Sequence, residues 1–70
     1  MKTYPKLRGR IVEKFGSIKK FAVALNKSEQ TAIGKLNGKF GFSQDDIIAW
    51  CNLLDISKDE VGDYFFSEKL

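Results

Sequence analysis

The sequence predicts an all-α protein with five helices. Apolar residues recur at intervals of three and four along most of the chain, and no segment alternates apolar and polar residues as a strand would. A serine stands immediately before four of the five apolar-periodic segments, where its hydroxyl can cap a helix N-terminus. At 70 residues the chain has room for one small hydrophobic core.

The first two helices are each expected to end at a residue that tolerates a left-handed conformation. A helix from about Pro5 to Phe15 begins with proline, which suits a first helical turn, and Gly16 ends it. The next helix covers about 17–25, with Ser17 as its N-cap, and Asn26 ends it. Their inward faces are Tyr4, Leu7, Ile11 and Phe15, then Ile18, Phe21, Ala22 and Leu25.

Three more helices follow in the second half of the chain. One covers about 28–36 and turns Ala32, Ile33 and Leu36 inward, and Phe40 and Phe42 in the next loop are expected to fold onto the core. Another is capped by Ser43. A short last helix has a capping box formed by Ser57 and Glu60, and the tail 67–70 is expected to be loose. The inward residues of these two helices are Ile47, Trp50, Cys51 and Leu54, then Val61, Tyr64 and Phe65.

Composition excludes several classes of protein. The single cysteine, Cys51, excludes an intrachain disulfide framework and is expected to be a buried, inert thiol. The chain has no histidine, no paired catalytic carboxylates and no phosphate-binding glycine loop, so we expect no enzyme, metal site or cofactor. No apolar run reaches the length of a membrane span, and the N-terminus lacks the apolar stretch of a signal peptide. A soluble, cytoplasmic protein is predicted.

Charge is distributed unevenly along the chain. Residues 1–39 hold ten Lys and Arg against two acids, a balance of +8, whereas residues 40–70 hold two lysines against seven acids, a balance of −5. A basic half favours a polyanion as partner, although a dipolar, solvated surface with no ligand would show the same pattern. The acidic half could instead dock a basic protein through Asp45, Asp46, Asp55, Asp59, Glu60 and Asp63.

The segment 17–38 resembles the helix-turn-helix of small bacteriophage and prophage repressors of the Cro and cI type. The frame KLRGRIVEKFG…FAVALNKS…KLNGK…YFF is similar to short Cro-like proteins from prophages of Gram-positive bacteria. The resemblance implies that residues 1–70 form one lambda-repressor-like helix-turn-helix domain, with 28–36 as its recognition helix. The chain departs from the family pattern at Asn26, Lys27 and Ile18, where glycine, an aliphatic residue and a phosphate-binding glutamine are usual.

In such a motif the second helix crosses the phosphate backbone and the third enters the major groove. Gln30 can pair with adenine, Glu29 can accept from cytosine, and Thr31 can contact either a base edge or a thymine methyl group. Ser28 and Gly34 complete the expected base-facing set, although Ser28 can serve as N-cap and Gly34 can allow close helix packing. The expected phosphate contacts are Ser17, Lys19, Lys35, Asn37 and Lys39.

Three functions fit these patterns. The first is a repressor that binds double-stranded DNA, as a homodimer on a palindromic operator, with Tyr64, Phe65 and Phe66 as candidate dimer contacts. The second is an antirepressor that binds another repressor protein through the acidic half. The third is a nucleoid-type protein that binds DNA without sequence preference. The salt dependence of binding to operator-like and random DNA distinguishes them.

Overall fold

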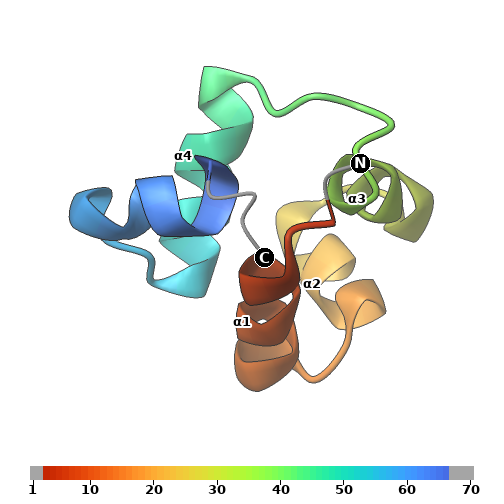
Figure 1. Ribbon diagram of the computed structural model, residues 1–70. Helices are drawn as coiled ribbons and strands as arrows, with labels where there is room; N and C mark the ends of the chain where they lie inside the picture. Colours follow the sequence, from red (N-terminus) through yellow and green to blue (C-terminus); the bar gives the residue numbers. More distant parts are fainter. Residues whose placement is uncertain (1–2, 67–70) are drawn as a thin grey trace.

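The computed structural model of the chain describes residues 3–66, and every regular element in this range is helical (Figure 1). The chain forms α1 (Pro5–Phe15), α2 (Ile18–Leu25), α3 (Glu29–Leu36), α4 (Gln44–Leu54), a 3₁₀ turn η1 (Lys58–Glu60) and a π-helical turn η2 (Gly62–Phe66). In Figure 1, α2 and α3 lie on one side of the molecule and α4 with the C-terminal turns on the other. The predicted all-α class is confirmed.

Side chains from all four α-helices meet in one hydrophobic core. Phe21 of α2 packs edge-on against Trp50 of α4, with ring centroids 4.7 Å apart, and Phe42 packs at 90° against the same indole at 4.8 Å. Edge-to-face packing of this kind is favourable for aromatic rings. The largest fully buried side chains are Trp50, Phe21, Leu7, Ile11, Leu36 and Leu54. The inward faces expected from the three-and-four spacing supply this core with one exception, because Ile33, which was expected to face inward, is only partly buried and lies on the outer side of α3.

Serine side chains cap three helices as expected. The hydroxyl oxygens of Ser17, Ser28 and Ser43 each accept the backbone N–H three residues further on, at 3.1 Å. Asn26 ends α2 with φ 64° and ψ 40°, in the left-handed region that asparagine tolerates. These local signals place the turn between α2 and α3 where the sequence predicts it.

The loop between α3 and α4 differs from the expectation for one of its two aromatic residues. Phe42 folds onto the core, with its ring centroid 5.0 Å from that of Phe65. Phe40 does not, because it packs against the outside of α3 and stays 46% exposed. The prediction that both phenylalanines cover the core is therefore wrong for Phe40.

The C-terminal segment is helical but irregular. The carboxylate of Glu60 accepts the backbone N–H of Ser57 at 3.2 Å, as the capping box predicts. Tyr64 and Phe65 are buried because η2 packs against α1, so they are core residues and are unable to form the predicted dimer surface. Phe66 remains exposed. The tail 67–70, expected to be loose, lies outside the described residues.

Two arginines of α1 bind the carboxyl ends of other helices. The guanidinium of Arg8 donates to the carbonyl of Leu36, at 3.1 Å, and that of Arg10 donates to the carbonyl of Leu54, at 2.8 Å. The last carbonyls of a helix lack partners within the helix and carry a partial negative charge, so a cation stabilises them. Part of the basic charge of residues 1–39 therefore holds the fold together. Within residues 3–66 no helix is both long and apolar enough to cross a membrane.

Candidate functional site

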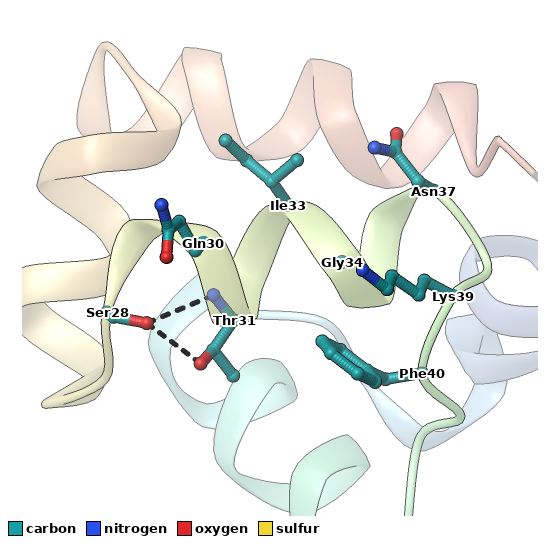
Figure 2. Close-up of a pocket in the computed structure, with 8 residues that line it drawn as sticks. All are labelled: Ser28, Gln30, Thr31, Ile33, Gly34, Asn37, Lys39 and Phe40. Carbon is teal, nitrogen blue, oxygen red and sulfur yellow. Dashed lines mark hydrogen bonds between the residues drawn. The ribbon is translucent and has the colours of Figure 1, made fainter.

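The outer side of α3 and the segment that follows it form an open pocket of about 530 Å³ (Figure 2). Figure 2 shows Lys39 and Phe40 reaching back over α3 from the chain that follows the helix. Six of the ten residues predicted to contact DNA line the pocket, together with Ile33 and Phe40. These six are Ser28, Gln30, Thr31, Gly34, Asn37 and Lys39.

The hydroxyls at the start of α3 are engaged with each other. Ser28 Oγ accepts the backbone N–H of Thr31 and also lies 2.8 Å from Thr31 Oγ1, as the dashed lines in Figure 2 show. Base contact by either hydroxyl would compete with this pair. Gln30 and Glu29 are exposed, and neither side chain forms a hydrogen bond to another residue of the described range. They are the two predicted base-reading side chains that remain available.

Gly34 makes room for Phe40. A Cβ atom at this position would overlap the ring of Phe40, at 2.5 Å from Cδ2 and closer still to Cε2. The missing side chain therefore permits close packing by a residue of the same chain, at the position where close approach to DNA was expected. This packing places an exposed aromatic ring on the face of α3 that would meet a base edge.

A double-mutant cycle tests this packing. Replacing Gly34 with alanine inside a helix normally stabilises a protein by about 0.5–1 kcal/mol. We expect that gain in a Phe40→Ala background, whereas in the wild type displacement of the Phe40 ring should cancel most of it. Urea unfolding of the four proteins measures the coupling. The same stabilisation by Gly34→Ala in both backgrounds would contradict the contact.

Lys35 is bound inside the molecule rather than presented to phosphates. Its Nζ lies 2.9 Å from Asp46 Oδ2 and donates to the carbonyl of Gly41 at 3.1 Å, and only 14% of its side chain is exposed. The backbone N–H of Ser43 and then the Lys35 ammonium lower the pKa of Asp46 below its ordinary value of 3.8. This ion pair joins the end of α3 to the start of α4. The assignment of Lys35 as a phosphate contact is therefore not supported by its geometry.

Replacing Lys35 with methionine should destabilise the protein while keeping the apolar stem. We expect a loss of about 1–2 kcal/mol at neutral pH, because the partly buried Asp46 loses a charged hydrogen bond. The folded pKa of Asp46 is depressed, so its stabilising effect is present above pH 3.8 and disappears as pH falls through the lower folded value. Urea unfolding across this range should show the two proteins converging in acid. A difference that is independent of pH would contradict the assignment.

The other predicted phosphate contacts differ in how far other residues of the chain already engage them. Asn37 Oδ1 accepts from Arg8 at 2.6 Å, and the ammonium of Lys39 lies 5.7 Å from the centroid of the Phe40 ring. Ser17 serves as N-cap of α2. Lys19 is exposed and has no ion pair within the described residues. Of the five predicted phosphate contacts, Lys19 is the most available to bind a phosphate.

Sequence reasoning missed two residues that shape this site. Phe40 was assigned to the core, and the signal for its true place was a helix-ending Asn-Gly pair that turns the chain back toward Gly34. Arg8 had no predicted role in the site. No local signal shows that it reaches Asn37, because the two residues are far apart in the sequence.

The acidic half is partly neutralised. Lys14 lies 2.7 Å from Asp55 and lowers the pKa of that carboxyl, and Lys6 lies 3.8 Å from Asp63. Asp45 and Asp59 are exposed and have no ion pair within residues 3–66. The same range contains no group of three or more Cys, Asp or Glu side chains placed to hold a metal ion.

Comparison with protein families decides the affiliation of the chain. Residues 2–68 match the model of a family described as "Protein of unknown function (DUF739)". The chain belongs to the DUF739 family. Comparison with curated proteins gives no match.

A solved structure extends this finding. The DUF739 chain is similar to the modulator of repression (MOR) of the temperate bacteriophage TP901-1 from Lactococcus lactis, known from a solution structure. The identity is 35%, the TM-score is 0.85, and the match covers 99% of this chain and 93% of that one. The phage setting expected from the sequence is thus supported. Neither the description of this family nor the name of this phage protein mentions a Cro- or cI-type repressor.

Proposed function

We propose that this chain modulates phage repression by binding a repressor protein. The observation that carries this proposal is the engagement of α3 within the chain: Lys35 is paired with Asp46, and Asn37 accepts from Arg8. A helix surface occupied in this way offers few donors to bases and phosphates. Similarity over nearly the whole chain to a phage modulator of repression supports the same conclusion.

Sequence-specific DNA binding is the second candidate, and the exposed first turn of α3 favours it. Glu29 and Gln30 are free to face a base edge, and Lys19 and Lys27 are exposed in the preceding α2 segment and turn. Such a protein would act as a dimer, and Phe66 is the one predicted dimer contact that is exposed. Both candidate functions place the protein in the cytoplasm, where operators and repressors meet.

Two binding experiments distinguish the candidates. Calorimetry follows the titration of the chain with the purified repressor of the same phage or prophage. In a separate selection, the DNA fragments that the chain binds are recovered from a random DNA pool and sequenced. We expect saturable binding to the repressor and no enriched DNA sequence. Enrichment of one sequence with no heat from the repressor would favour an operator-binding protein, in which Gln30→Ala should relax sequence choice. Equal, salt-sensitive binding to all DNA would favour a nucleoid protein.

A further inference from the structure

A second hollow, of about 270 Å³, lies between α4 and the segment that follows it, away from α3. Its walls are mainly apolar: Ile47, Ile48 and Cys51 come from α4, and Ile56 and Val61 come from the chain beyond it. Burial raises the pKa of the Cys51 thiol, so this residue contributes an uncharged wall. The hollow could therefore accept an apolar side chain.

Ile48 is the most accessible apolar residue of this hollow. It is 52% exposed, whereas Ile56 is buried and the other apolar walls are partly buried. A single exposed isoleucine needs no explanation, but an exposed isoleucine at the edge of an apolar hollow is typical of an interaction surface. Its α4 neighbour Asn52 also lines the hollow and offers one amide for a hydrogen bond.

Two exposed acids are close in sequence to residues that line the hollow. Asp45 lies one turn before Ile48 on the same exposed face of α4, and Asp59 is exposed in η1 and follows the lining residue Lys58 in the chain. Lys58 is the one charged residue among those that line the hollow. Three of the acids of residues 40–70, namely Asp46, Asp55 and Asp63, are paired with lysines, whereas Asp45 and Asp59 have no ion pair within residues 3–66. An apolar hollow within such a field selects a partner that is basic as well as apolar.

We infer that this hollow, with Ile48 at its edge and the exposed Asp45 and Asp59 next to its lining residues in the chain, docks a basic amphipathic segment of the repressor. The identity of the partner rests on the proposed function. DNA-binding proteins carry Lys and Arg to neutralise phosphates, so a repressor possesses a segment with the required charge. One apolar side chain of that segment enters the hollow, and its basic residues face the two aspartates. Binding of this chain then covers a basic surface of the repressor.

Paired substitutions at matched exposure test the surface. Val12 on α1 is 54% exposed and does not line the hollow, so Val12→Lys is the control for Ile48→Lys. We expect Ile48→Lys to weaken repressor binding at least about tenfold and Val12→Lys to change it less than about twofold. Circular dichroism confirms that both variants fold. Equal repressor affinities of Ile48→Lys and Val12→Lys would overturn the inference. So would a Phe40→Ala variant that loses repressor binding while Ile48→Lys retains it.

A peptide probe separates this inference from the proposed function. The probe is a synthetic amphipathic helix with leucines on one face and lysines on the other, and a peptide with glutamates in place of the lysines is its control. In NMR titrations we expect amide shifts at Ile48, Asn52 and Val61 with the basic peptide only, and none in Ile48→Lys. Shifts confined to α3, or none, would overturn the assigned surface. Peptide binding at the hollow without repressor binding would leave the surface standing and refute the proposed function.

Discussion

Replacing Trp50 with alanine should lower the free energy of unfolding by about 3–5 kcal/mol. The indole is 1% exposed and contacts the rings of both Phe21 and Phe42, so its removal leaves a cavity where α2, α4 and the connecting loop meet. A domain of this size has a total stability of only about 3.5–10 kcal/mol. We expect the thermal midpoint to fall by at least about 12 °C, or the variant to be unfolded at 37 °C.

Val23→Ala is the control for this experiment. Val23 belongs to α2 but is largely exposed, so its truncation should change stability by less than about 0.5 kcal/mol. Thermal unfolding followed by circular dichroism measures both variants. Similar midpoints for the two variants would show that Trp50 is not the centre of the core.

Arg10→Met should produce the second largest loss, about 1.5–3 kcal/mol. The guanidinium donates to the carbonyls of Leu54 and Asp55, at 2.8 and 2.9 Å, and only 23% of the side chain is exposed. Its removal leaves the carboxyl end of α4 without these partners. Methionine keeps the aliphatic packing, so urea unfolding reports mainly the lost charged hydrogen bonds.

Lys14→Met provides a matched comparison on the same helix. Lys14 also binds Asp55, but through an exposed carboxylate that salt and water screen. We expect a much smaller change than for Arg10→Met, and one that vanishes in high salt. If Lys14→Met were the more destabilising variant, the arginine contacts would not be what joins α1 to α4.

Local signals predicted the helices well because they depend on neighbouring residues. The serine caps, the left-handed Asn26 and the apolar spacing each act within one or two turns. The irregular C-terminus was less predictable. Its 3₁₀ and π-helical turns depend on how Tyr64 and Phe65 pack against α1, which no short-range pattern encodes.

The sequence pointed to α3 as the candidate site, but it did not show which of its side chains are engaged by other residues of the chain. The sequence assigned Gln30 and Lys39 to DNA contact, and the structure places both residues at one pocket on α3. The engagement of Lys35 by Asp46 and of Asn37 by Arg8 depends on contacts between distant segments. A lysine in the sequence looks the same whether it faces phosphate or a carboxylate of its own chain. The expectation of DNA binding was therefore stronger than the folded surface supports.

Release of a repressor from its operator tests the central claim most directly. A fluorescently labelled operator is saturated with the repressor of the same phage or prophage, and the chain is added while anisotropy is followed. We predict that anisotropy falls to the value of free operator at a stoichiometric excess of wild-type chain. The chain alone should leave the anisotropy of the operator unchanged. A repressor that stays bound, together with salt-sensitive binding of the chain itself to the operator, would contradict the account.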